Sequence, residues 1–374
     1  MLSPRLRRQL LMCLKSFSLA QDSAQAHECV RYNNAARFDR SALQGYFMKA
    51  IVYTQYGPPD VLQLKEIATP TPADDEVLIK LYAASVNPLD QHLMRGDVRL
   101  MGGGLLKPKH KGLGADIAGR VEAVGRNVKQ FQPGDEVFGG SFGGKGLGGF
   151  AEFVCAPEDK LTLKPANISF EDAAAVPVAA ITALQGLRDK GRIQPGQKVL
   201  VDGASGGVGT FAVQIAKSFG AEVTAVCSTR NVETARSVGA DHVIDYTRED
   251  FTENGQRYDL ILAANAYHSI FDYRRALSQD GTYVMVGGGG LQALQALLLG
   301  PLLSLIGSMK MRFVSAKINK KDLVLLKDLL EARKVVPVID KRYALSDVAE
   351  ALRYLEEGHA QGKVVITVGD SSDA

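Results

Sequence analysis

The spacing of apolar and polar residues changes character along the chain. Leucines at four-residue intervals, with basic residues between them, open residues 1–47, as in an amphipathic helix. From Met48 to about Pro165, short apolar runs alternate with turns that contain Pro, Gly or Asp. This punctuation predicts the short strands of a compact barrel. The expected strands cover residues 49–53, 76–84, 118–124, 136–138 and 151–156.

Beyond a helical stretch at Phe170–Lys190, the pattern alternates between strand and helix. Strands are expected at 198–202, 222–227, 242–244, 260–263 and 282–286, with helices at 207–219 and 232–238. Such alternation predicts a doubly wound parallel sheet, so we expect an α/β protein. The chain closes with expected helices at 321–332 and 346–357 and a strand at 363–368.

One segment, 291–306, is apolar throughout, but Gly300 and Pro301 interrupt it. It is too short to be a clean membrane span. We interpret it as a buried or pocket-lining helix, with an interfacial helix as the alternative. No integral membrane segment is predicted, and an apolar wall of this kind favours a hydrophobic substrate.

Composition narrows the classes of function. The 374 residues predict two domains, and a net charge of +3 gives no electrostatic reason to expect nucleic acid as a partner. The four cysteines are far apart and form no Cys-x-x-Cys pair. This argues against a disulfide framework and fits a reducing compartment, so we expect a cytoplasmic protein.

The arginine-bearing start of residues 1–47 leaves an alternative location open. It resembles an organellar transit peptide, although Asp22, Glu28 and Asp39 weaken that interpretation. The other interpretation is an extension that does not fold with the rest of the chain.

The strongest motif runs from Val199 to Gly209, where a predicted strand enters a glycine-rich turn and then a helix. Its small residues match the dinucleotide-binding pattern G-x-G-x-x-G at Ala204, Gly206 and Gly209. The first small residue permits the tight turn, and the second lets a pyrophosphate approach the backbone closely. The third lets the helix pack against the strand. We expect residues Ala204, Ser205, Gly206, Gly207, Val208 and Gly209 to bind the cofactor; the alternative is a crossover that binds no nucleotide.

The second strand of this unit indicates which dinucleotide is bound. NAD-binding proteins usually place a carboxylate at its end, but this chain has Ser228 and Arg230 there. A guanidinium group suits a 2′-phosphate, and Lys217 is expected to add positive charge. NADPH is therefore favoured over NADH, the alternative for Arg230 being a solvated loop residue.

At this point the residues resemble the zinc-free quinone oxidoreductase branch of the medium-chain dehydrogenase/reductase superfamily. The resemblance rests on the runs 48–57, 85–90, 114–119, 196–217 and 359–365. It implies a GroES-like β-barrel catalytic domain, residues 48–172 and 308–374, split by an inserted Rossmann domain, residues 173–307. Residues 1–47 would be an extension.

The resemblance also implies that the chain binds no zinc. Zinc-dependent members place a cysteine where this chain has Asn87, and a Gly-His-Glu motif where it has Gly114, Ala115 and Asp116. Amide and methyl groups cannot replace thiolate and imidazole ligands.

By the same resemblance, Asn87 and Asp90 lie beside the nicotinamide and its ribose, and Thr182 touches the nicotinamide. Asn265 lies over the cofactor, and Lys363 faces its phosphates. Two plain alternatives remain: Asn87 as a turn residue before proline, and Lys363 as a solvated lysine. His92 and Tyr53 are candidate proton donors, with solvent as a third source.

We therefore expect an NADPH-dependent enzyme that transfers hydride to a quinone or an α,β-unsaturated carbonyl. The alternatives are an enoyl-thioester reductase, for which the basic residues Lys107, Lys109, His110 and Lys111 would bind carrier phosphates, and a non-enzymatic NADPH-binding or sensing protein. A homodimer is expected, with Thr282–Val286 as a candidate edge strand.

Overall fold

The computed structural model describes residues 47–97, 104, 106–108, 112–141, 148–305 and 308–369. The chain divides after Phe47, and the second unit, from Met48 onward, carries both sheets described below. The expectations for residues 1–46, and those for Lys109, His110 and Lys111, lie outside the described residues.

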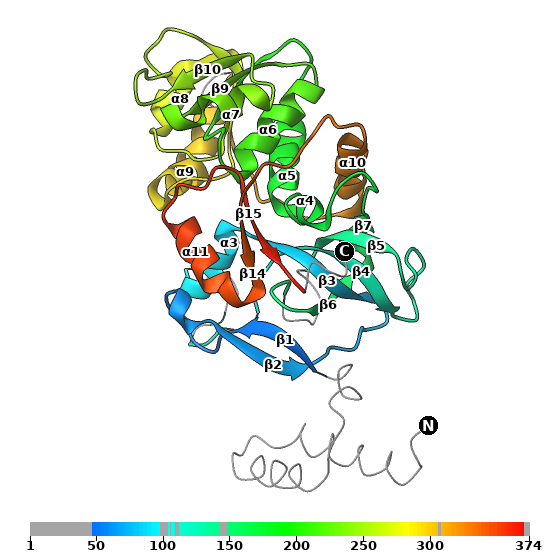
Figure 1. The fold of residues 1–374 in the computed structure, drawn as a ribbon. Helices are drawn as coiled ribbons and strands as arrows, with labels where there is room; N and C mark the ends of the chain where they lie inside the picture. Colours follow the sequence, from blue (N-terminus) through cyan, green and yellow to red (C-terminus); the bar gives the residue numbers. More distant parts are fainter. Residues whose placement is uncertain are drawn as a thin grey trace, which may run out of the picture. The chain divides into compact units, whose positions relative to one another are not determined.

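One sheet has six parallel strands among the described residues (Figure 1). Their order is β10 (His242–Asp245), β9 (Glu222–Cys227), β8 (Lys198–Asp202), β11 (Tyr258–Ala263), β12 (Leu277–Met285) and β13 (Lys310–Phe313). The connecting helices are α6 (Gly207–Ser218), α7 (Val232–Ser237), α8 (Ile270–Ala276) and α9 (Gly290–Leu305). This is the doubly wound sheet that the sequence predicts, and the α/β fold class is confirmed.

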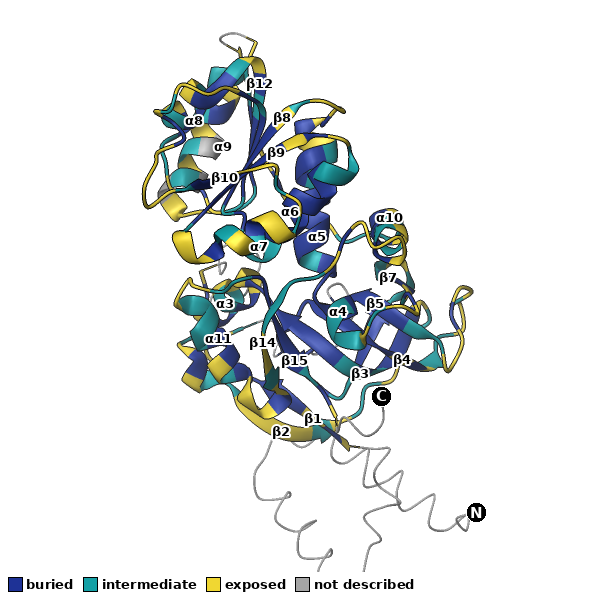
Figure 2. Ribbon diagram, turned by 45° about the horizontal axis from the view of Figure 1, so that its top comes forward, coloured by how far each residue is buried: buried dark blue, intermediate teal, exposed yellow. Residues whose placement is uncertain are grey.

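Alternating strand residues divide between the two faces of this sheet. On β8, Val199 and Val201 pack in one apolar cluster with α6, through residues such as Phe211. Leu200, between them, packs in a separate cluster with Tyr273 of α8. The strands are buried on both faces (Figure 2), as parallel strands covered by helices must be.

The direction of strand succession reverses at the centre of this sheet. β8 pairs with β9 on one side and with β11 on the other, so the loops that leave the carboxyl ends of β8 and β11 diverge. Ligands of open α/β sheets bind at such a switch point. The fold therefore directs attention to the loop after Asp202.

The second sheet is mixed and has seven strands among the described residues. Its path is β14 (Ile339–Ala344), β15 (Lys363–Thr367), β3 (Glu76–Val86), β4 (Asp116–Val124), β5 (Glu136–Gly140) and β7 (Leu161–Leu163), with β6 (Phe153–Pro157) on β3. The strands β1 (Phe47–Val52) and β2 (Gln63–Ala68) pair separately. Around them lie α3 (Pro88–Arg95), α4 (Phe170–Ala174), α5 (Pro177–Leu184), α10 (Lys320–Glu331) and α11 (Val348–Glu356).

The last strand joins the first half of the chain. β15 pairs antiparallel with β3, placing Val364 opposite Val86 and Val365 opposite Ser85. This register brings Lys363 to the end of β3, where Asn87 begins the next helix. A long-range pairing of this kind is what a barrel split by an insertion requires.

Several details differ from the expectations. β2, β7, β13 and β14 were not predicted, because their apolar runs are short or half-exposed. α9 continues through Pro301 rather than breaking there. β13 lies after the predicted boundary at residue 307, yet it pairs with β12, while the domain boundaries themselves stay a prediction. Thr282–Val286 is wrong as an edge strand, because β12 is flanked by β11 and β13.

The pairing of β3 with β4 leaves no room for a side chain at Gly119. A Cβ atom there would lie 2.1 Å from the carbonyl oxygen of Lys80, so Gly119→Ala should lower the free energy of unfolding by about 3 kcal/mol. Urea denaturation measures this. In the control Gly140→Ala, the new methyl group meets the flexible end of Ile318 and should cost clearly less. Equal losses would contradict the assignment of backbone crowding.

Candidate cofactor and active site

The loop after β8 contains two glycines, Gly206 and Gly209, and a different physical reason explains why each of them is glycine. At Gly209, a Cβ atom would lie 2.1 Å from the oxygen of Gly203, so the protein's own packing requires glycine there. At Gly206, apart from its chain neighbours, the one atom of the described residues within 4 Å of such a Cβ is the oxygen of Gly203, at 3.7 Å. The space beside Gly206 is therefore open, as close approach of a pyrophosphate requires.

The helix that follows this loop is suited to an anion. Gly206 is the N-cap residue of α6 in an extended conformation, and it offers no side chain to cap the first N–H groups. Those groups and the helix dipole attract negative charge at this end. Gly203, with φ of +77°, turns the chain so closely that a Cβ atom would contact Asn265 of the loop after β11. Asn265 thus borders the glycine loop, and its position over the cofactor stays a prediction.

A buried carboxyl group lies at the start of the glycine loop. Asp202 is 1% exposed, and Tyr273 Oη donates a 2.5 Å hydrogen bond to its carboxylate. Burial raises the pKa of Asp202 to about 7, against the opposing effects of the Tyr273 hydroxyl and the Gly203 N–H. Its backbone oxygen accepts from the N–H of Ala264 at 2.8 Å. Asp202 therefore ties the glycine loop to the loop after β11.

The end of β9 carries the residues expected at the 2′ position of the ribose. Ser228 is half-buried and Arg230 is exposed, with one guanidinium nitrogen donating to the backbone oxygen of His359 at 3.1 Å. Asn231 is 4% exposed, and its Nδ2 lies 3.0 Å from Ser205 Oγ and 3.2 Å from Ser228 Oγ. The amide thus joins the glycine loop to the end of β9.

Lys217 was expected near the 2′ position of the ribose, together with Ser228 and Arg230, but it lies elsewhere. It belongs to the last turn of α6, ten residues and about 15 Å along the helix from its start. Its ammonium group contacts both carboxylate oxygens of Asp241, at 2.8 and 2.7 Å. The prediction that Lys217 adds charge near the ribose is therefore wrong, because the helix places it at the opposite end from the loop.

A fully buried polar cluster lies at the ends of β3, β4 and β15. Asp116 is 0% and Lys363 3% exposed, and Asn87 is likewise buried. Lys363 Nζ lies 2.7 Å from Asn87 Oδ1 and 3.3 Å from Asp116 Oδ2. Asn87 Nδ2 and Ser85 Oγ also donate to Asp116 Oδ2, at 2.9 and 2.7 Å. These contacts give the buried ammonium group a charged partner and a polar one.

Lys363 connects this cluster to the glycine loop. A Cβ atom on Gly207 would lie 2.9 Å from Cδ of Lys363, so the aliphatic part of the lysine covers the first residue of α6. Its ammonium group points instead at Asn87 and Asp116, which differs from the expectation that it faces the cofactor phosphates. The interpretation of Lys363 as a solvated lysine is also wrong, because it is buried.

Asp90 and Asn87 form the start of α3. Asp90 Oδ2 accepts from the Asn87 N–H and Oδ1 from the Gly114 N–H, both at 2.8 Å, so the carboxylate fixes two turns at once. Asp90 is 0% exposed, and burial raises its pKa to about 7. Asn87 is thus the N-cap residue of α3, directly before a proline, which agrees with its alternative interpretation as a turn residue. It is also a member of the buried cluster.

The candidate proton donors lie in different surroundings. His92 is on α3 and is half-exposed, with Nδ1 2.9 Å from Asp97 Oδ2. Tyr53 is buried, and burial, with the nearby Tyr56 and Asp90, raises its pKa to about 12. Thr182 is buried on α5 and donates to the oxygen of Val178 at 2.7 Å.

Sequence reasoning missed three members of this region. Asp116 was considered only as the last residue of the run that replaces a Gly-His-Glu motif, and the sequence gives no sign that it pairs with Lys363, 247 residues away. Tyr273 and Asn231 carry no motif. A polar residue three positions after Ser228 was the only signal for Asn231.

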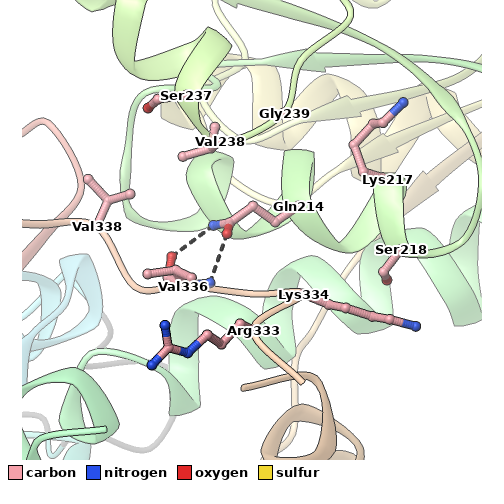
Figure 3. A pocket seen from close by; sticks show the side chains of 10 residues that line it. All are labelled: Gln214, Lys217, Ser218, Ser237, Val238, Gly239, Arg333, Lys334, Val336 and Val338. Atoms are coloured by element: carbon pink, nitrogen blue, oxygen red, sulfur yellow. Dashed lines mark hydrogen bonds between the residues drawn. The ribbon is translucent and has the colours of Figure 1, made fainter. Parts of the chain in front are cut away.

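The structure also has a cavity away from these residues (Figure 3). Its volume is about 720 Å³, and it is lined by the carboxyl ends of α6 and α7 and by residues 333–338. Gln214 spans it, exchanging hydrogen bonds of 2.8 and 2.9 Å with the backbone of Val336. Of the predicted site residues, only Lys217 lines it, so this cavity is not part of the candidate site.

A glycine loop at the switch point, beside a buried polar cluster on a barrel sheet, is the arrangement of a dinucleotide-dependent oxidoreductase. Comparison with known families agrees. Residues 73–166 match the family described as alcohol dehydrogenase GroES-like domain. Residues 238–366 match the family described as zinc-binding dehydrogenase.

Individual relatives are similar over most of the chain. The 2-methylene-furan-3-one reductase of Solanum lycopersicum is 38% identical, over 85% of this chain and 79% of that protein. The chloroplastic NADPH-dependent alkenal/one oxidoreductase of Arabidopsis thaliana is 36% identical with the same coverage. The quinone oxidoreductase structure from Coxiella burnetii has a TM-score of 0.76 and 30% identity, over 86% of this chain and all of that one.

The chain belongs to the medium-chain dehydrogenase/reductase superfamily, in its quinone oxidoreductase branch. It is an NAD(P)H-dependent oxidoreductase that transfers hydride. No helix in the described part of the chain is long and apolar enough to cross a bilayer.

The two loop glycines should separate stability from cofactor binding. Gly209→Ala forces a methyl group onto the backbone of Gly203 and should lower the free energy of unfolding by about 3 kcal/mol. Gly206→Ala meets open space, so stability should stay within about 1 kcal/mol while the Kd for NADPH rises at least tenfold. Urea denaturation and cofactor titration measure the two effects. A Gly206→Ala protein with unchanged Kd would remove Gly206 from the binding surface.

The Asp202–Tyr273 contact should give a pH-dependent stability. Asp202 has a raised folded-state pKa, so its carboxyl group is mostly protonated in the folded protein at pH 5 and ionised at pH 8. Tyr273→Phe removes a hydrogen bond that is stronger to the charged form. Its cost should therefore be about 1 kcal/mol at pH 5 and about 2 kcal/mol at pH 8. Urea denaturation at both values tests this, and a pH-independent cost would contradict the assigned charge state.

Proposed function

We propose that the protein uses NADPH to reduce a quinone or an α,β-unsaturated carbonyl compound, without a metal. The observation that carries this proposal is the buried Lys363–Asn87–Asp116 cluster. By the resemblance, Asn87 stands at the position of a zinc-binding cysteine, and Asp116 stands next to the position of a zinc-binding histidine. Relatives named as alkenal/one and quinone oxidoreductases support the acceptor class.

The residues present fit NADPH. The open space beside Gly206 and the uncapped start of α6 suit the pyrophosphate. Ser228 and Arg230 offer a hydroxyl group and a guanidinium group where a carboxylate would reject a 2′-phosphate. When bound, the nicotinamide supplies the hydride; the chain's own residues bind, orient and exclude water.

The donor set does not fit zinc. Asp116 Oδ2 already accepts from Ser85, Asn87 and Lys363, and Oδ1 accepts from the Val178 N–H at 2.8 Å. A divalent ion at this carboxylate would lie against the Lys363 ammonium group. The neighbouring candidates are an amide and the methyl group of Ala115, and neither replaces a thiolate or an imidazole. Without a Lewis acid, an acceptor that is already electrophilic is required.

The cluster would act by position and charge. Asn87, fixed by Lys363 and Asp116, would lie beside the nicotinamide and its ribose, with Asp90 holding the turn that carries it. Thr182, in the last turn of α5, would border the nicotinamide, and Asn265 would lie over the cofactor. The product's proton would come from His92, from Tyr53, whose raised pKa keeps its hydroxyl protonated, or from solvent.

The exposed leucines of α9, at positions 294, 298 and 302, are consistent with a hydrophobic acceptor. We further propose a homodimer and a cytoplasmic location. An organelle is the alternative location, because several relatives are named as chloroplastic or mitochondrial. Size-exclusion chromatography with light scattering and N-terminal sequencing of the natural protein test these two points.

Steady-state kinetics test the proposed reaction. We expect oxidation of NADPH with an ortho-quinone or a short 2-alkenone, and a much lower kcat/KM with NADH. Arg230→Ala should lower kcat/KM for NADPH about 10- to 100-fold and leave that for NADH within about twofold. Equal use of both cofactors by the unaltered protein would overturn the NADPH assignment. Stoichiometric zinc in protein purified without added metal would overturn the metal-free mechanism.

A further inference from the structure

The amide group of Asn231 lies between two hydroxyl groups, in the region where we propose that the 2′-phosphate binds. One hydroxyl belongs to Ser205 in the glycine loop and the other to Ser228 at the end of β9. Both lie within 3.2 Å of Asn231 Nδ2, so each serine oxygen accepts one N–H of the same amide group.

We propose that Asn231 is a positioning residue that makes Ser205 and Ser228 hydrogen-bond donors to the 2′-phosphate. An NH₂ group only donates, so each hydroxyl proton must point away from Asn231. Neither hydroxyl donates to another residue in the described part of the chain. Both serines are half-buried, and their protons are free to point at a ligand.

The chemistry of the ligand fixes the direction of these hydrogen bonds. The ionised oxygens of a phosphate accept hydrogen bonds and do not donate them. If the amide were turned by 180°, its oxygen would accept from both hydroxyl groups, and their lone pairs would face the phosphate. The amide orientation therefore matters for NADPH, whereas the 2′-hydroxyl of NADH can donate as well as accept.

The surroundings of Asn231 explain why it holds this position. The residue is 4% exposed, and its N–H donates to the backbone oxygen of Ser228 at 2.9 Å. Its Oδ1 is buried and has no hydrogen-bond partner among the described residues. An unpartnered buried acceptor costs stability. This cost is explained if the NH₂ end of the same amide group orients the two serines for cofactor binding.

The inference rests on the proposed use of NADPH, and Asn231→Asp tests it. A carboxylate accepts from both serines, so it reverses their hydroxyl groups and adds negative charge beside the phosphate. The ratio of the NADH Kd to the NADPH Kd should fall about 10- to 100-fold. A merely structural role would weaken both cofactors equally and leave the ratio unchanged.

Two further variants separate hydroxyl direction from charge. Asn231→Leu carries no charge and should lower the same ratio about 3- to 10-fold, because the serines are no longer oriented. In the Asn231→Leu background, Ser228→Ala should cost less NADPH affinity than it does in the unaltered protein. The control Gln279→Glu adds the same charge at an exposed position near the amino-terminal start of β12, whereas the proposed site lies at the carboxyl ends of the strands, and it should leave the ratio unchanged.

The outcomes distinguish the two proposals. If the unaltered protein binds NADH as tightly as NADPH, the proposed cofactor preference fails before any variant is considered. If it prefers NADPH but Asn231→Asp keeps that preference, or if Asn231 and Ser228 act independently in the double variant, the role of Asn231 is overturned. Circular dichroism and thermal unfolding of each variant establish that it is folded.

Discussion

The contact of the Lys363 ammonium group with Asp116 and Asn87 is the constraint around which the site is organised. An unpaired charge inside a protein is very costly, so the lysine holds its carboxylate and amide partners in place. Removing one member of a buried pair generally costs about 3 to 5 kcal/mol. The participants come from β15, β4 and the start of α3, so one set of contacts fixes three segments that are distant in sequence.

The same lysine relates the barrel sheet to the nucleotide-binding sheet. Its aliphatic part lies against Gly207, the first residue of α6, while its charged end belongs to the cluster with Asn87. The two ends of one side chain thus face the proposed pyrophosphate site and the proposed nicotinamide site. The Val178 N–H, which donates to Asp116, adds the first turn of α5 to this junction.

The glycine loop is held by a second set of buried contacts. Asp202 and Tyr273 fix its base, and Asn231 joins its serine to the end of β9. These contacts hold the loop on both sides of Gly206, where its open side lies. Binding a cofactor to a preformed surface avoids the entropic cost of ordering that surface, which suits an enzyme whose cofactor must be placed accurately for hydride transfer.

These contacts also explain the difference from metal-dependent relatives. In a zinc site, neutral or anionic ligands converge on a cation. Here a protonated lysine supplies the positive charge, and the carboxylate beside it is fully hydrogen-bonded. In the proposed metal-free reaction, this charge would serve to position groups rather than to polarise a carbonyl group, and the acceptor would have to be electrophilic already.

The sequence by itself determined the α/β class, most of the strands and helices, and the position of the glycine loop between β8 and α6. β8 and β9 were predicted to the residue, because short runs rich in Val and other apolar residues, each preceded by a glycine turn, leave few alternatives. The resemblance also led to the prediction that the chain binds no zinc, because Asn87 and Ala115 cannot act as thiolate and imidazole ligands, and this stays a prediction.

Only the tertiary structure decided which polar groups meet. Lys217 has the right charge but lies at the far end of α6, a distance that its place in the motif does not reveal. Lys363 was placed near the cofactor, but its pairing with Asp116 depends on the register of β15 on β3. Asn231 and Tyr273 gain their roles from contacts across loops. Such contacts depend on how separate segments fold together, and local sequence carries no record of that geometry.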